Sequence, residues 1–198
     1  MHAPVQVVGA RFDLILSDPA WTFEDKLGKR GAAANYAEQG IEALLRLPVA
    51  RIASANSVHL MWVVDTHLPE GIALLTGWGY QYVGVPFVWA KKTSRGNRHF
   101  GLGRTTRKEV ELVLLGRRGK GLPRVSASVR QMIEAPVREH SRKPDEIRDR
   151  IVELYGDVRR LEMNARTRAL GWHSWGFDVG ASDQTLRSVN APLRVNFT

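Results

Sequence analysis

The most informative absence in this 198-residue sequence is cysteine, of which the chain has none. Without cysteine there is no disulfide bond and no thiolate ligand for a metal, and the composition suits a reducing compartment. The sequence has no run of about 18 apolar residues, so we expect no membrane-spanning helix and no membrane partner. The first residues lack a basic segment followed by an apolar one, so we expect no signal peptide and a cytoplasmic protein.

Two common nucleotide-binding signatures are also missing. The sequence has neither a GxGxxG turn nor a GxxxxGK[ST] loop, which disfavours dinucleotide-binding and P-loop enzymes. The six histidines show no spacing typical of a metal site, so we expect no metal. The remaining composition, 43% hydrophobic and 25% charged, is ordinary for a globular chain. We predict a single domain at residues 1–180 and a tail without clear pattern at 181–198.

Acidic residues are scarce in one segment. Residues 91–130 hold twelve lysines and arginines against two acids, a local charge of +10 in a chain of net charge +9. The rest of the chain is therefore close to neutral. A basic segment on a near-neutral body favours a surface that faces a polyanion such as nucleic acid. The alternative is a solvated basic face with no partner.

The apolar pattern predicts an α/β fold with a parallel-rich sheet. We expect strands at 12–17, 57–64, 80–90, 110–115, 129–135 and 160–164. We expect helices at 41–47, at 49–53 after the break at Pro48, at 69–76 and at 143–155, the last with Pro144 in its first turn. Residues 22–40 and 91–108 carry glycines without steady periodicity and are predicted as loops, and 172–179 as a compact aromatic ending.

The tetrapeptide Asp18-Pro19-Ala20-Trp21 directly follows the first predicted strand. The end of a buried strand is where an open α/β sheet places its chemistry. The exocyclic amine of adenine is a poor nucleophile because its lone pair is delocalised into the ring. Two acceptors, the carboxylate of Asp18 and the carbonyl of Pro19, would favour a pyramidal nitrogen, and Trp21 would stack on the base. The alternative is a plain turn with a buried tryptophan.

Seven ordered pieces of the sequence resemble one family, the S-adenosylmethionine-dependent adenine-N6 methyltransferases related to the catalytic subunit of the eukaryotic messenger-RNA methyladenosine writer. The 17–21 piece is similar to the family's Asp-Pro-Pro-Trp motif. The other pieces are 35–36, 60–63 with 89–91, 101–119, 140–146, 161–166 and 171–176. The resemblance covers residues 12–179. It implies a Rossmann-like methyltransferase sheet in permuted order, with the catalytic motif first and the cofactor strand last.

The resemblance also implies roles for particular residues. The catalytic residues would be Asp18, Pro19, Ala20 and Trp21. The residues that bind S-adenosylmethionine would be Asp18, Tyr36, Lys143, Asn164, Ala165, Arg166, Arg168 and Asp178. The substrate-binding residues would be Tyr36, Lys91, Arg95, Arg98, Arg104 and Glu111. The substrate would be adenine in nucleic acid, DNA in preference to RNA, in a prokaryotic or virus-infected cell, and a homodimer is left open.

Two departures from the family pattern stand out. Ala20 replaces the second proline of the motif, and Phe177-Asp178 replaces an asparagine-containing pair. Other functions also stay open at this point: an RNA methyltransferase, a catalytically silent nucleic-acid-binding partner subunit, or a methyltransferase of small molecules or protein. Two of these residues also have a purely structural alternative. Lys143 would then be a solvent-exposed residue that caps a helix, and Arg166 would be part of a surface ion pair.

Overall fold

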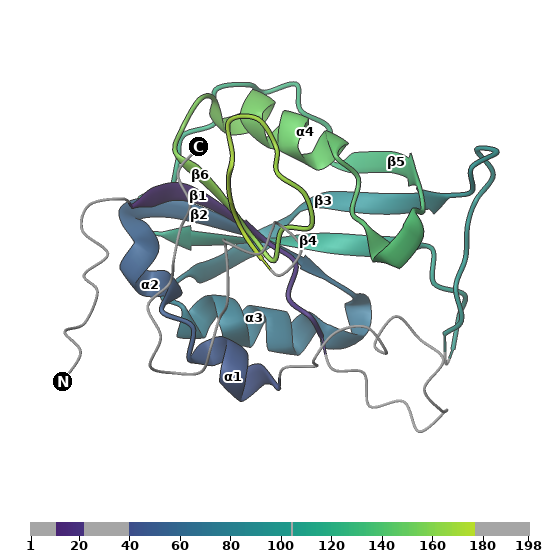
Figure 1. Ribbon diagram of the computed structural model, residues 1–198, viewed down its shortest axis with the longest axis horizontal. Coiled ribbons are helices and arrows are strands. Elements are labelled where there is room, and N and C mark those ends of the chain that lie inside the picture. The colour runs from purple at the N-terminus through teal and green to yellow at the C-terminus, as the bar shows by residue number, and fades with distance from the viewer. Residues whose placement is uncertain (1–10, 22–39, 104, 177–198) are drawn as a thin grey trace.

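The computed structural model describes residues 11–21, 40–103 and 105–176 (Figure 1). The strands are β1 (Phe12–Ser17), β2 (Ala53–Val63), β3 (Gln81–Lys92), β4 (Val110–Arg118), β5 (Met132–Pro136), β6 (Arg160–Met163) and β7 (His173–Trp175). The helices are α1 (Ile41–Leu45), α2 (Val49–Ile52), α3 (Leu68–Gly77) and α4 (Glu146–Tyr155), with short 3-10 turns η2 (Asp65–His67) and η3 (Glu139–Ser141).

The strands form one seven-stranded sheet in the order β5-β3-β4-β2-β1-β6-β7. The strand β4 runs antiparallel to both neighbours, and the other four pairings are parallel. The parallel-rich α/β sheet predicted from the sequence is thus confirmed, and it is consistent with a Rossmann-like methyltransferase fold. The permuted order and the domain limits stay predictions.

Helices cover both faces of the sheet (Figure 1). On one face, α1, α2 and α3 pack Leu44, Ile52 and Leu74 against β1 and β2. On the other face, α4 packs Ile147 and Ile151, which lie four residues apart on one side of the helix. Both faces of the central strands are therefore buried, which explains why β1 reads as an almost continuous apolar run.

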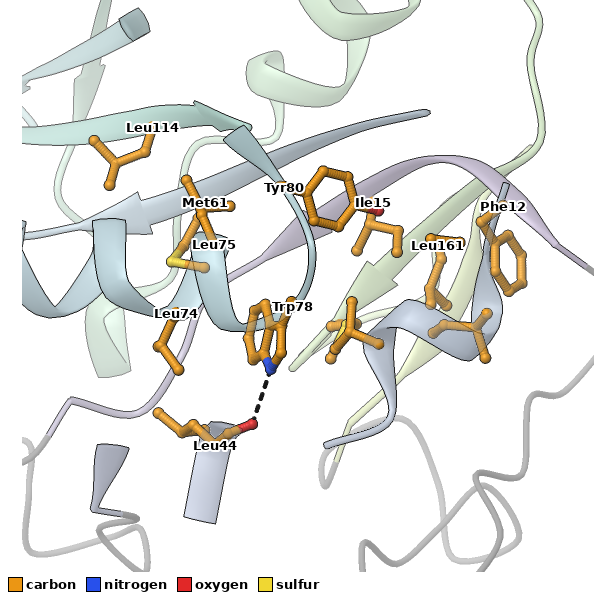
Figure 2. Packing of buried hydrophobic residues seen from close by; sticks show 14 of the residues in the cluster. Phe12, Ile15, Leu44, Met61, Leu74, Leu75, Trp78, Tyr80, Leu114 and Leu161 are labelled. Atoms are coloured by element: carbon orange, nitrogen blue, oxygen red, sulfur yellow. Dashed lines mark hydrogen bonds between the residues drawn. The ribbon is translucent and has the colours of Figure 1, made fainter. Parts of the chain in front are cut away.

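The core beneath α3 is shown in Figure 2. Trp78 follows the helix, is 2% exposed, and its indole nitrogen donates a hydrogen bond to the carbonyl of Leu44, 3.0 Å away. This bond satisfies the indole N–H and ties α3 to α1. The large side chains Phe12, Met61 and Tyr80 close the same cluster.

All six predicted strands are present, β1 with the predicted limits and the other five with different ones. The strand β4 continues to Arg118, three residues beyond its predicted end, because Gly116 within it lets the strand pass closely over Tyr80. The strand β3 has register shifts between Tyr82 and Phe87, the stretch that contains Pro86, a residue that cannot donate a backbone hydrogen bond to a neighbouring strand. The strand β7 was not predicted, because three residues are too few to show a period.

The start of α4 was predicted wrongly. The helix begins at Glu146 rather than Lys143, so Pro144 precedes the helix instead of occupying its first turn. Asp145 is the N-cap residue but makes no side-chain capping hydrogen bond. Its carboxylate binds arginines instead, as described below.

The described residues contain neither a candidate membrane span nor a candidate metal site. No helix there has the length and apolar character needed to cross a membrane. Within the same residues no group of histidine, aspartate and glutamate side chains has the arrangement of a metal site.

Candidate active site

The tetrapeptide Asp18-Pro19-Ala20-Trp21, predicted to be catalytic, follows β1 directly, at the carboxyl edge of the parallel part of the sheet. Ser17, the last residue of β1, pairs in parallel with Met163, the last residue of β6. Asp18 and Asn164 therefore leave the sheet next to each other. This is the edge where α/β folds bind their ligands.

A pocket opens at this edge between the ends of β1 and β6 and the segment before α4. Asp18, Lys143, Asn164 and Arg166 all line it. Its remaining walls come from Leu16, Ser17, Trp62, Arg142, Pro144, Ile147, Arg148, Glu162 and Thr167. The structure thus brings together residues that are up to about 150 positions apart in the sequence and that the resemblance assigned to the cofactor.

Alternating charges run from Asp18 on the pocket wall to Lys91 in β3. The ammonium of Lys143 lies 3.1 Å from Asp18 Oδ2 and 3.2 Å from Glu111 Oε2. The other oxygen of Glu111 lies 2.7 Å from the ammonium of Lys91. Lys143 also lies over the ring of Trp62, 5.9 Å from its centroid. One lysine therefore joins an acid at the end of β1 to an acid within β4.

The environment sets the protonation of this chain of charges. Burial raises the pKa of Asp18 and outweighs the opposing effect of Lys143. Burial opposes the charge on Lys143, but Asp18 and Glu111 together raise the pKa of the lysine. Burial also opposes the charge on Glu111, yet Lys143 and Lys91 lower the pKa of that carboxyl. Lys143 is thus held as a cation and Glu111 as an anion, while Asp18 is the group most readily neutralised by acid.

The backbone around Lys143 is held by a cluster of arginines on Asp145. The carboxylate of Asp145 accepts hydrogen bonds from Arg138 and Arg148, both at 2.6 Å, and from Arg142 at 3.0 Å. Arg138 also donates to the carbonyl of Lys143. Partial burial raises the pKa of Asp145, but Arg138 and Arg148 outweigh burial and lower this pKa to about 2. Sequence reasoning missed this cluster, because no local pattern says that these arginines meet Asp145.

A second acid on the pocket wall was also missed. Glu162, in β6, receives Nε and Nη2 of Arg148 at 2.8 and 3.0 Å, a two-pronged pair. Burial nevertheless raises the pKa of Glu162 above its ordinary value, against the effect of Arg148. The alternation of β6 places Glu162 on the same side of the strand as Asn164, which was the available sequence signal.

The rest of the tetrapeptide is fixed against the sheet. Pro19 is buried and Ala20 is half-buried. The indole nitrogen of Trp21 donates a hydrogen bond to the carbonyl of Trp62, 3.3 Å away. One face of the ring packs at 5.5 Å from the ring of His67 in η2. Trp21 is thus half-buried and packed against the core, and it is not among the residues that line the pocket.

A buried hydrogen bond fixes the strand end just before Asp18. The hydroxyl of Ser17 lies 2.8 Å from Nε2 of His59 in β2, and both side chains are fully buried. Burial lowers the pKa of His59 to about 3, so the imidazole is neutral. Sequence reasoning treated His59 as part of an apolar run and did not expect this pair.

The predicted cofactor residues after β6 lie in a tight turn. Asn164 has a left-handed backbone with φ of 61°, a conformation that asparagine tolerates better than most residues. Ala165 is buried, and its N–H donates to the carbonyl of Trp175 at 3.0 Å. Arg166 is half-buried on the pocket wall, whereas Arg168 is exposed.

The predicted substrate residues fall into two groups. Lys91 and Glu111 are paired to each other, and Glu111 connects them to Lys143 on the pocket wall, although neither of the two lines the pocket itself. Arg95 and Arg98 are exposed on the connection between β3 and β4. Tyr36, Arg104 and Asp178 lie outside the described residues.

The groups on the pocket wall fit S-adenosylmethionine in their chemistry. An amino acid moiety needs an acid and a cation, which Asp18 and the pair Lys143 and Arg166 supply. Lys143 contacts one oxygen of Asp18, and a carboxylate has about four acceptor sites, so capacity remains for an ammonium group. Asn164 and Glu162 offer polar partners for hydroxyl groups.

A Rossmann-like sheet with such a pocket at the ends of β1 and β6 defines a methyltransferase of the Rossmann-like class. More narrowly, the chain belongs to the MT-A70 family, whose model matches residues 12–178. It is an adenine-N6 methyltransferase, and this family in general uses S-adenosylmethionine.

Individual relatives agree with this assignment. The chain is 27% identical over 193 residues to the Type II methyltransferase M.MunI of Mycoplasma sp, covering 88% of this chain and 80% of that protein. It is 30% identical over 182 residues to the N6-methyladenosine RNA methyltransferase MTA1 of Cryphonectria parasitica, covering 85% and 52%. It is 28% identical over 194 residues to the N(6)-adenine-specific methyltransferase METTL4 of Mus musculus, covering 89% and 39%. The chain thus spans about half or less of the length of these two eukaryotic relatives.

Proposed function

We propose that this protein transfers a methyl group from S-adenosylmethionine to the N6 amine of adenine in DNA. One observation carries the proposal. Asp18, at the end of β1, lies 3.1 Å from Lys143 and lines one pocket with Asn164 and Arg166. The acceptor for the amine and the groups for the donor therefore share one wall.

In this proposal Asp18 and Pro19 orient the amine. The Asp18 carboxylate and the Pro19 carbonyl accept the two N–H groups of the adenine amine, which localises the nitrogen lone pair. The base stacks beside Trp21, an arrangement worth about 1–3 kcal/mol. No strong base is required, because the methylated nitrogen is a cation and loses its proton readily to a nearby acceptor or to water.

The cofactor is held by the far end of the chain. Lys143 and Arg166 would bind its carboxylate, Asp18 its ammonium group and Asn164 its hydroxyl groups. When bound, the cofactor supplies an electrophilic methyl group on a sulfonium. The fixed pairs around Lys143 mean that little has to reorganise when it binds.

The preference for DNA rests on the comparisons. The relative covered over the largest share of its own length, 80%, is named a Type II methyltransferase, a term used for enzymes that modify DNA. The relative named for RNA is covered over 52% of its length. RNA is the alternative that the experiment must separate.

The decisive experiment supplies labelled S-adenosylmethionine with DNA and RNA of the same sequence. We expect label on DNA, recovered as N6-methyladenine after digestion to nucleosides, and none with the Asp18→Ala variant. Label on RNA alone would reassign the substrate. Equal labelling by the variant would refute the role of Asp18.

A catalytically silent partner subunit is the second candidate. It predicts that the protein binds S-adenosylmethionine but transfers no methyl group to either polymer, even with a partner protein supplied. The intact acid and its paired lysine argue against that outcome.

A further inference from the structure

The connection between β3 and β4, which we call the arm (described residues 93–103 and 105–109), ends in exposed apolar side chains. Leu102 is 88% exposed and Phe100 is 54% exposed. Figure 1 shows the arm extending past the end of the sheet. Two large apolar side chains on a projecting loop need a partner to cover them.

The tip of the arm has a defined shape. Gly101 and Lys108 exchange two backbone hydrogen bonds, of 2.8 and 3.2 Å, which close a small hairpin. Gly103 lies so close to the backbone of Thr106 that an added Cβ would sit 2.1 Å from its carbonyl oxygen. Leu102 is thus presented between two glycines on a closed turn.

The same hairpin is anchored beside the active site. Lys108 forms an ion pair with Asp65 of η2. His67 of that short turn packs against Trp21. The 3-10 turn therefore links the arm to the catalytic tetrapeptide.

The charged side chains of the arm indicate which kind of partner covers the tip. Arg95, Arg98 and Arg107 are exposed on the arm, and Arg107 lies over the ring of Phe100 at 5.4 Å from its centroid. Arginines on an arm that also carries an apolar tip suit a nucleic acid, in which phosphates surround a stack of bases. A symmetric contact with a second copy would bring like charges together.

The position of Asp18 inside the pocket explains why the enzyme would need such a tip. Asp18 lies in a pocket at the sheet edge, with a side chain 23% exposed, so an adenine still paired in a duplex cannot present its amine there. The base must leave the stack, and the gap that it leaves is unfavourable unless something fills it. We propose that Leu102, backed by Phe100, enters the gap left by the target adenine in duplex DNA. This inference rests on the proposed function.

The test measures the transfer of a labelled methyl group to a circular DNA of the size of a phage genome. The same DNA is supplied once as a single strand and once as a duplex. For Leu102→Ala we expect transfer to the duplex to fall about ten-fold while transfer to the single strand stays within about two-fold, because only the duplex base has to be unstacked. Leu102→Met should restore the duplex activity. Leu170→Ala is the matched control, since Leu170 is 103% exposed and lies outside the arm.

Each other result would overturn the inference. An unchanged ratio of duplex to single-strand transfer, or a wild-type protein that labels only the single strand, would refute the wedge and leave the proposed function intact. A wild-type protein that labels neither form would refute both. Loss of both activities together with loss of a dimer in sedimentation would show that the tip is a contact between two copies.

Discussion

The pocket and the arm both depend on charged residues, but they use them in opposite ways. In the pocket, Lys143 lies between two acids and its neighbours are held by further pairs within the chain. On the arm, Arg95 and Arg98 are exposed. Charges that are neutralised internally make a site that is rigid before its ligand arrives, whereas exposed charges serve a partner that comes from outside.

The comparison also divides the basic segment itself. Three lysines in it are paired with acids of the same chain: Lys91 with Glu111, Lys92 with Glu134 and Lys108 with Asp65. The local charge of +10 therefore overstates what an external polyanion meets. The exposed arginines and Lys120 are the described cations of this segment that remain for this task.

The largest expected effect is at Asp18. Asp18→Asn keeps the shape of the side chain but removes the charge and one of its acceptors. We expect kcat to fall roughly 100- to 1,000-fold, as when one preorganised group at a reacting centre is removed. Single-turnover methyl transfer at saturating cofactor measures this. If the rate fell less than about five-fold, Asp18 would only support the fold of the pocket.

Removing Lys143 is expected to act on cofactor binding. Lys143→Met leaves Asp18 and Glu111 without their common cation, so we expect the Kd for S-adenosylmethionine to rise about 10- to 100-fold, the range for a lost charged hydrogen bond. Equilibrium dialysis measures the Kd. Lys92→Met is the control, because Lys92 pairs with Glu134 away from the pocket. Equal effects of the two changes would mean that Lys143 acts only through general stability.

The contrast between pocket and arm explains what could be predicted from sequence. The strand β1 is indicated by its apolar run, and the tetrapeptide follows it directly in the chain, whereas β6 is indicated by the alternation of Leu161 and Met163 with charged residues. Lys143 and Arg166 could be assigned only through the resemblance, because no local pattern says that they meet Asp18.

The missed residues are those whose role depends on three-dimensional partners. Asp145 could have been an N-cap, and only the fold shows that it binds arginines instead. The Ser17–His59 pair is invisible within two apolar strands, because strand pairing alone brings the residues together. The ion pair of Lys91 could not be predicted for the same reason, since its partner Glu111 is twenty positions away on an antiparallel strand.

Charge reversal on the arm should weaken DNA binding and leave the pocket alone. For the double variant Arg95→Glu and Arg98→Glu we expect the KM for DNA to rise about ten-fold and the slope of log binding constant against log salt to fall by about 2. The Kd for the cofactor should not change. The double variant Arg46→Glu and Arg51→Glu, with the same change in net charge on exposed residues near α1 and α2, is the control. Equal effects of the two pairs would indicate a long-range field rather than contact by the arm.

The smallest expected effect concerns the pocket, where a change at Glu111 alters only the charges around Lys143. Burial raises the pKa of Asp18, Lys143 opposes this, and the nearby charge of Glu111 adds to it. Acid should therefore reduce activity as Asp18 takes up a proton, at a pH above the ordinary carboxyl value of 3.8.

Glu111→Gln removes the neighbouring anion and leaves Lys143 to Asp18 alone, and both changes lower the pKa of Asp18. We expect the acidic limb of the kcat/KM profile to move to lower pH, while the variant Glu134→Gln, which alters an exposed pair, leaves it in place. A limb that moves to higher pH would mean that Glu111 helps to keep Asp18 ionised by fixing Lys143, and that the position of the lysine matters more than the repulsion between the two acids.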